Sequence, residues 1–178
     1  MGVRLSSVVR FADALLRHGA IGDWPAARNG LQLENGGQVT RIAAAVDAHE
    51  GTIGMALSKG ADLLVVHHGI FWSDLIPITG ARFRKLRAAI GGGLAIYSSH
   101  LPLDLHPVIG NNVLLCRALG IGVGRPFLEE KGERVGRLVA ARVTRSALIR
   151  RFEAAVGGPV RFAGAGPAAC KRSEEHTS

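Results

Sequence analysis

Two short, continuously apolar runs are the sequence feature that most constrains the fold of this chain: residues 62–66 (DLLVV) and 94–98 (LAIYS). Apolar runs of this length without alternation are typical of strands buried on both faces of a mostly parallel sheet. A third run at 41–47 (RIAAAVD) has the same character. Because helices must cover both faces of such a sheet, we predict a layered α/β protein with a mostly parallel or mixed sheet.

The segments between the predicted strands show the periodicity and the end signals of helices. Ser6 or Ser7 is expected to cap the first helix, and Asp47 and Glu50 have capping-box spacing for the second. Residues 19–40 are rich in Gly, Asn and Pro and are predicted to form a loop. The predicted helices cover residues 4–18, 48–59, 81–90, 111–119 and 145–156, and further strands are expected at 134–143 and 160–163.

The composition is that of a globular protein, because 47% of the 178 residues are hydrophobic and 20% are charged. No apolar stretch approaches the roughly 20 residues that span a bilayer. Arg10 and Asp13 interrupt the apolar pattern near the N-terminus, which indicates an amphipathic helix rather than a signal peptide. Cys116 and Cys170 form neither a disulfide framework nor a cysteine metal motif. We therefore expect a cytoplasmic protein without a membrane partner.

The net charge of +8 raises the question of nucleic-acid binding. Residues 125–172 hold 11 of the basic residues and 4 of the acidic ones, so the excess is concentrated there. It is spread through a strand–helix pattern without the aromatic residues that single-strand binders interleave with their basic groups. A solvated surface is the favoured interpretation, and a nucleic-acid partner is not expected.

The polar residues with metal-binding chemistry stand at the ends of two predicted strands. His67 and His68 follow the first apolar run, and His100 and Asp104 follow the second. Ligands of α/β sheets bind beyond the carboxyl ends of the strands. Four of the seven histidines fall between positions 67 and 106, which makes this the strongest chemical signal in the chain.

Adjacent residues of an extended segment point to opposite sides, so His67 and His68 are each expected to face a different ion of a metal pair. Asp104 is expected to supply an oxygen ligand. His100 is expected to orient a ligand or to transfer a proton. Imidazole and carboxylate suit Zn, Fe, Ni or Mn without selecting among them. The predicted cofactors are therefore two divalent metal ions of undetermined identity.

Plainer interpretations stay open beside these. A pair of histidines at a strand end is often structural. Asp47 is either a helix cap or a pocket residue, and Phe71 and Trp72 form either a pocket wall or packing beneath a loop. His18 is expected at a helix C-terminus, where its partial charge is favourable.

Four segments occur together in an order that resembles a known family: NGLQ at 29–32, VDAHEGTI at 46–53, GADLLVVHHGIFW at 60–72 and SSHLPLDLHPVIGNN at 98–112. As far as about residue 170, the chain resembles the NGG-one-interacting factor three family, whose members are known as GTP cyclohydrolase I type 2 homologues. The histidine pair after a buried strand, the HxxxD motif after the next and GNN at a helix start form a specific signature together.

The resemblance implies two intertwined α/β repeats, two divalent metals in a cavity and a ring-shaped homohexamer. It implies that His67, His68 and Asp104 are metal ligands. The implied activity is that of a metal-dependent hydrolase on a small molecule, with GTP as the candidate nucleotide. The alternative is a non-catalytic metal-binding, regulatory or scaffold protein that acts through protein partners.

Three regions are predicted: a first α/β region at 1–124 with the metal motifs, the start of a second and incomplete one at 125–172, and a non-native tail at 173–178. The family continues to a further His and Glu that complete the metal site. Here the closing KRSEEHTS lacks the apolar strand expected after its Lys-Arg pair. Glu175 and His176 are expected to lie in a polar tail with no framework around them, and therefore not to replace those ligands.

Overall fold

The computed structural model describes residues 2–72 and 76–176. They form two compact units, Met1–Pro102 and Leu103–Ser178. The division falls inside the short helix α4 (Leu101–Asp104), earlier than the boundary predicted at 124. Within the described residues, no helix combines the length and the apolar character needed to cross a membrane.

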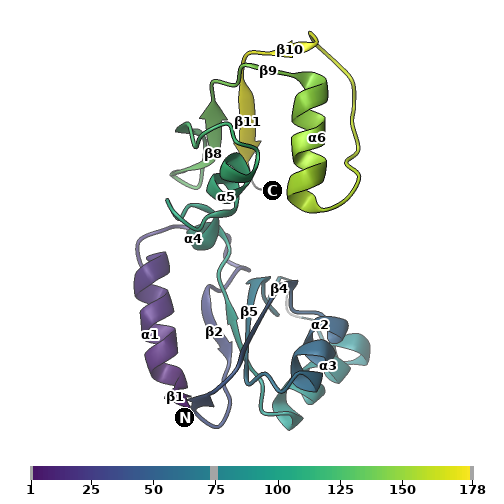
Figure 1. The fold of residues 1–178 in the computed structure, drawn as a ribbon. Helices are drawn as coiled ribbons and strands as arrows, with labels where there is room; N and C mark the ends of the chain where they lie inside the picture. Colours follow the sequence, from purple (N-terminus) through teal and green to yellow (C-terminus); the bar gives the residue numbers. More distant parts are fainter. Residues whose placement is uncertain (1, 73–75, 177–178) are drawn as a thin grey trace. The chain divides into compact units, whose positions relative to one another are not determined.

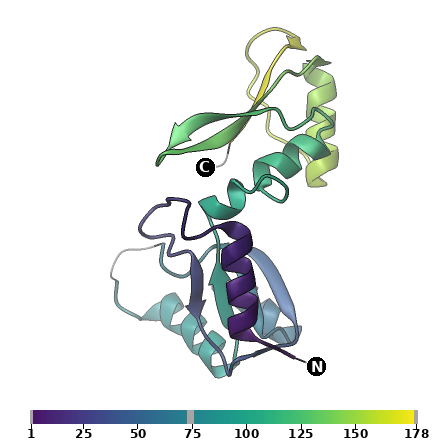
Figure 2. The same ribbon diagram turned by 90° about the vertical axis from the view of Figure 1, so that its left-hand side faces the viewer.

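The first unit is built on a four-stranded sheet in the order β2-β6-β5-β4. Its elements are α1 (Leu5–Leu16), β2 (Gly30–Leu33), β4 (Ile42–Asp47), α2 (Glu50–Ser58), β5 (Leu63–His68), α3 (Gly80–Gly91) and β6 (Ala95–Ser98), with a small ribbon of β1 (Val3–Arg4) and β3 (Gln38–Val39). β4, β5 and β6 are parallel, and β2 is antiparallel to β6. Helix α1 covers one face of this sheet, and α2 and α3 cover the other (Figures 1 and 2). The predicted layered, mixed α/β fold is confirmed.

The core of the first unit lies between the sheet and helices α2 and α3. Leu64, Val66 and Ile96 from the sheet are almost fully buried, and Ile53 of α2 packs into the same cluster. Each such side chain stabilises the fold by roughly 1.5–3 kcal/mol relative to leaving it exposed. Because this packing anchors β5 and β6, it fixes the positions at which both strands end.

Several local predictions for the first unit were wrong. The loop predicted at 19–40 contains strand β2, which pairs with β6 through Leu31↔Tyr97. The first helix begins at Leu5, and no side chain caps it. β4 was expected to be buried, yet it lies at the end of the strand order, and its Val46 is 63% exposed. Gly and Asn around a strand of four residues concealed β2, because they are also the residues of loops.

The cap of α2 is His49, not Asp47. The Nδ1 atom of His49 accepts hydrogen bonds from the backbone N–H groups of Gly51 (3.0 Å) and Thr52 (3.4 Å). The Thr52 hydroxyl lies 3.1 Å from the backbone nitrogen of His49 and accepts from it, which completes a capping box. Because His49 caps the helix, the Asp47 side chain at the end of β4 can make other contacts.

The second unit has a three-stranded antiparallel sheet in the order β11-β8-β7. Its elements are α5 (Asn111–Ala118), β7 (Arg125–Glu130), β8 (Glu133–Val139), α6 (Arg145–Val156) and β11 (Ser173–His176), with a short ribbon of β9 (Val143–Thr144) and β10 (Ala169–Cys170). Thr144 caps α6 as predicted, because its hydroxyl accepts from the backbone N–H of Ala147 at 3.2 Å. The strand expected at 160–163 is not formed.

The expectation that the C-terminal residues lack a structural framework was wrong. Ser173–His176 form β11, which pairs with β8 from Ser173↔Val139 to His176↔Gly136. Residues 177 and 178 lie outside the described part of the chain. A polar strand was overlooked because apolar content was the criterion, whereas backbone pairing with β8 does not depend on apolar side chains. The origin of the segment stays a prediction.

Asp62 ties the start of β4 to the start of β5. Its carboxylate accepts hydrogen bonds from the Thr40 backbone N–H (2.7 Å), the Thr40 hydroxyl (2.5 Å) and the Arg41 backbone N–H (3.1 Å). We expect Asp62→Ala to lower the free energy of unfolding by about 1–2 kcal/mol, since charge-assisted hydrogen bonds are lost at a partly exposed site. Urea denaturation measures this, with the exposed Glu34→Ala as a charge-matched control. Equal midpoints for Asp62→Ala and wild type would contradict it.

Candidate metal centre

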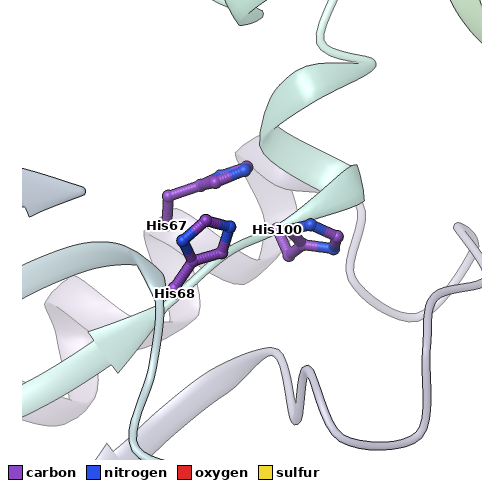
Figure 3. A group of neighbouring side chains, drawn as sticks. All are labelled: His67, His68 and His100. Atoms are coloured by element: carbon purple, nitrogen blue, oxygen red, sulfur yellow. The ribbon is translucent and has the colours of Figure 1, made fainter. Parts of the chain in front are cut away.

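Three histidines meet at the carboxyl ends of β5 and β6. His67 and His68 are the last two residues of β5, and His100 lies two residues beyond the end of β6. The strands are parallel neighbours in the register Val66↔Ser98, so their ends share one edge of the sheet. Each histidine offers one ring nitrogen, and these atoms all lie within 4.8 Å of one another. Figure 3 shows the three rings gathered at this edge. Such a group is able to hold a metal ion.

Each ring of the group makes a hydrogen bond through Nδ1. His67 donates to the backbone carbonyl of Ser99 (3.2 Å), and His68 and His100 pair with the carboxylates of Asp47 (2.7 Å) and Asp23 (2.8 Å). An acceptor at Nδ1 keeps a proton on that nitrogen, so in the neutral ring Nε2 carries the lone pair. This arrangement orients metal-ligating histidines and raises their basicity in known sites. The engagement of the Nδ1 atoms therefore favours Nε2 as the ligating nitrogen of each ring.

Asp23 is a buried carboxylate that holds His100 in place. Its side chain is only 6% exposed, and the side chain of His100 is 3% exposed. Burial alone would raise the pKa of Asp23, but hydrogen bonds from His100, Asn29 and the Trp24 and Leu101 backbone hold that pKa below its ordinary value. The amide oxygen of Asn29 in turn accepts from the backbone N–H of His100 at 2.7 Å. The 19–40 segment, predicted only as a loop, thus supplies the anchor of one histidine.

A second layer of polar contacts supports Ser99, the partner of His67. The Ser99 hydroxyl lies 2.9 Å from Nε2 of His18, and Nδ1 of His18 lies 3.1 Å from the Asp13 carboxylate. The Tyr97 hydroxyl donates to the same carboxylate at 2.9 Å. His18 does follow the first helix, as expected, but its side chain is turned inward to this network. These side chains therefore hold the hydroxyl of Ser99, the residue whose carbonyl orients His67.

The buried position of His67 favours its neutral form. Burial lowers the pKa of His67 to about 4, helped by the neighbouring His100 and His68 rings, while the bond to the Ser99 carbonyl opposes this. A neutral imidazole is the form that binds a metal ion. At neutral pH, protons therefore compete only weakly with a metal ion for His67.

The lowered pKa makes the metal-free fold sensitive to acid. In the unfolded chain, His67 takes up a proton near the ordinary histidine pKa of 6.5, whereas the folded residue resists protonation until about 4. The unfolded state binds more protons in this window, so stability falls as the pH drops from about 6.5 to about 4. We expect His67 to contribute on the order of 1–2 kcal/mol to that loss, since its remaining solvent contact screens the effect.

Urea denaturation of the chelator-treated chain at several pH values measures this contribution. His67→Gln should flatten the dependence between about pH 6.5 and 4, because Gln cannot titrate. Parallel slopes for wild type and His67→Gln would contradict the prediction.

Trp72 closes one side of the histidine group. Its ring meets those of His68 and His100 edge-on, with centroid distances of 5.4 and 4.6 Å. Phe71, predicted beside it as a wall residue, is 39% exposed. The indole therefore acts as an apolar wall of the centre, and of the two interpretations left open for Trp72 the pocket wall fits this geometry.

Comparison with known proteins decides the family. A family model described as Duf34/NIF3 (NGG1p interacting factor 3) matches residues 3–173. The chain belongs to the Duf34/NIF3 family. The family predicted from the four sequence segments is thus confirmed.

Curated Duf34/NIF3 relatives carry the name GTP cyclohydrolase 1 type 2 homolog. The protein of Deinococcus radiodurans is 42% identical over 129 residues, which are 72% of this chain and 48% of the relative. That of Pyrococcus abyssi is 41% identical over 130 residues, which are 72% of this chain and 51% of the relative. The chain spans about half the length of the curated relatives it matches.

Solved structures share the fold. TTHA1606 from Thermus thermophilus gives a TM-score of 0.82 at 32% identity, and the match covers 98% of this chain and 69% of that one. Protein ybgI, whose function is given as unknown, gives a TM-score of 0.81 at 30% identity, with 97% and 68% covered. HcgD from Methanocaldococcus jannaschii, at 18% identity and a TM-score of 0.74, is similar in fold alone.

The residues predicted for the site divide into two groups in this Duf34/NIF3 chain. His67, His68 and His100 come together, so His100 stands beside the predicted ligands and itself offers a ligand atom. Asp104 is buried at the end of α4, and its Oδ1 accepts a hydrogen bond from the Asn111 side chain at 2.6 Å. Because Asp104 belongs to the second unit, its role as a ligand stays a prediction.

Sequence reasoning missed Asp23 and assigned Asp47 mainly to a helix cap. The signal for Asp47 was its position at the end of a predicted strand neighbouring the one that carries His68. Asp23 offered a weaker signal, as an acidic residue six positions before Asn29 of the NGLQ motif. Neither contact could be paired from the sequence, because the bonded residues lie 21 and 77 positions apart.

The donor set fits a divalent metal ion. Three imidazoles suit Zn, Fe or Ni, and tris-imidazole binding leaves coordination positions for water or substrate. Ligand atoms that all lie within 4.8 Å of one another form a group that could hold one metal ion. A second ion needs further ligands, for which Asp104 is the predicted oxygen donor.

Proposed function

We propose that this chain binds divalent metal at the His67–His68–His100 centre and that the centre supports a hydrolytic reaction of the GTP cyclohydrolase 1 type 2 kind. One observation carries the proposal: three histidines gather their ligand atoms within 4.8 Å while each uses Nδ1 in a hydrogen bond to a fixed acceptor. Family membership agrees with it, since curated relatives are named as homologs of that enzyme.

The roles follow from the contacts. His67 and His68 hold the metal from the end of one strand, and Asp104 supplies an oxygen ligand in the proposed two-metal form. A divalent ion supplies Lewis-acid polarisation and lowers the pKa of bound water toward neutrality. Asp23 and Asp47 keep the His100 and His68 rings in the ligating tautomer. His100 either completes the ligand set or moves a proton, and its fixed Nδ1 leaves Nε2 for both tasks.

The substrate that we propose is a small molecule of the nucleotide class. The assembly that we propose is a homo-oligomer, with the hexamer implied by the family as the expected form. Both proposals concern the whole family fold, of which this chain spans about half. Sedimentation velocity tests the assembly, because a hexamer and a monomer of 18.7 kDa chains differ sixfold in mass.

Turnover separates the hydrolase from the alternative of a non-catalytic metal-binding scaffold. The metal-loaded chain is incubated with GTP and other nucleoside triphosphates, and products are resolved by ion-exchange chromatography. We expect turnover that falls at least about 100-fold in His68→Ala, since the metal supplies several kcal/mol of transition-state stabilisation. His106→Asn should retain it. Metal binding by wild type without turnover of any nucleotide would favour the scaffold.

A further inference from the structure

A separate pocket of about 420 Å³ opens beside the metal centre, between the end of β4, the start of α2 and helix α3. His68 belongs both to the wall of this pocket and to the histidine group. The described residues that line it with polar or aromatic side chains are Asp47, His49, His68, Trp72 and Lys85. A molecule in this pocket therefore lies against one of the candidate ligands.

Lys85 brings a positive charge to this wall. Its Nζ atom donates one hydrogen bond to the backbone carbonyl of Ala48 at 3.0 Å. An ammonium group has three donors, so two remain for a ligand. Burial, and then the nearby Arg82, lower the pKa of Lys85. Both effects disfavour the charged form of Lys85. A bound anion would favour that form, because its negative charge attracts the ammonium group.

The other wall residues fit the same ligand chemistry. His49 accepts two backbone N–H groups at Nδ1, so its neutral ring carries the proton on Nε2 and is a further donor. Asp47 is the acidic residue of the described wall, and its Oδ1 atom is engaged by His68 at 2.7 Å. The pocket wall thus combines the donors of Lys85 and His49 with the Asp47 carboxylate, which is engaged by His68.

We propose that this pocket is the anion subsite of the metal centre and that Lys85 binds the phosphate group of a phosphorylated small-molecule substrate. The proposal rests on the proposed function, because the rest of the substrate is placed against His68 of the metal centre. It places the phosphate of such a compound at Lys85 and requires the molecule to reach from there to the histidine group. Arg84, the neighbouring cation on α3, is engaged by Glu50 at 2.9 Å and is not part of the subsite.

Calorimetric titration of the full chain with inorganic phosphate, with and without bound metal, tests the subsite. We expect phosphate affinity to fall at least about tenfold in Lys85→Gln and to stay near wild type in Lys85→Arg, since the charge-assisted bonds are lost only in the first. Arg87→Gln, an exposed change of equal charge on the same helix, is the matched control and should bind as wild type does. Equal affinity in Lys85→Gln and wild type overturns the proposal, as does a wild-type chain that binds no phosphate.

A labelling measurement on the wild-type chain keeps the proposal testable if Lys85→Gln does not fold. Phosphate should protect Lys85 from an amine-acylating reagent, as read by mass spectrometry, and should leave the exposed Lys59 unprotected. Equal labelling of Lys85 with and without phosphate overturns the proposal. Metal content is measured on the same samples. If the chain binds phosphate through Lys85 but holds no metal, the result would contradict the proposed function and support the anion subsite.

Discussion

Asp23→Ala is expected to lower the free energy of unfolding by about 3–5 kcal/mol and to weaken metal binding about 10–100-fold. The carboxylate accepts hydrogen bonds from four donors on His100, Asn29, Trp24 and Leu101. Removing it leaves buried donors unpaired, and an unpaired buried donor costs about 1–3 kcal/mol. The same change frees the His100 ring to rotate, so the ligating nitrogen is no longer held toward its neighbours.

Two measurements on Asp23→Ala separate these effects: urea denaturation of the metal-free chain, and competition for zinc against a chelator of known affinity. Asp23→Asn keeps one acceptor oxygen and should lie between Asp23→Ala and wild type in both. Glu34→Ala removes an exposed carboxylate and should leave both values unchanged. An Asp23→Ala chain with wild-type stability and zinc affinity would show that Asp23 does not anchor the centre.

Gly69→Ala is expected to lower the free energy of unfolding by about 3 kcal/mol, the upper end for overpacking, and to disturb the adjacent His68. An added methyl group at Gly69 would overlap the amide of Gln32, with the Cδ atom at only 2.5 Å. That amide cannot move cheaply, because it donates to the Ala27 and Arg28 carbonyls and accepts from the Ile70 N–H. The clash therefore has to be absorbed by the turn that follows β5.

The matched control for Gly69→Ala is Gly54→Ala on α2, where an added methyl group meets nothing within 4 Å. The control should stabilise the chain by about 0.5–1 kcal/mol, because Ala is the better residue in a helix interior. The two variants are compared by thermal denaturation and zinc competition. Gly69→Ala with a stability equal to that of Gly54→Ala would contradict the close approach of Gln32.

The apolar runs predicted the central strands of the first unit, because a continuous apolar run indicates a strand that is buried on both faces. β5 needs apolar side chains on both faces, such as the adjacent Leu63 and Leu64, and a continuous apolar run expresses that need in the sequence. The same reasoning placed His67 and His68 at the carboxyl end of the sheet. It also misjudged β4, since an edge strand with small residues has nearly the same composition as a central one.

The remaining parts of the site depend on contacts between distant residues, which composition does not encode. Nothing local distinguishes Asp23 from any acidic residue in a loop, yet β2 and its preceding loop carry it to His100. His100 was predicted to act behind the ligands because its four-residue spacing to Asp104 drew attention to that pair. The register of β5 and β6 brings its ring to the two histidines instead.

The most direct test of the central claim is the metal content of the purified full chain, determined by elemental analysis after exposure to zinc, iron, nickel or manganese and removal of loosely bound ions. The comparison is between wild type, the His67→Ala/His68→Ala/His100→Ala variant and the His106→Asn control. We predict one or more divalent ions per wild-type and control chain and a near-complete loss in the triple variant. Equal metal content in the triple variant and wild type would contradict a metal centre at these histidines.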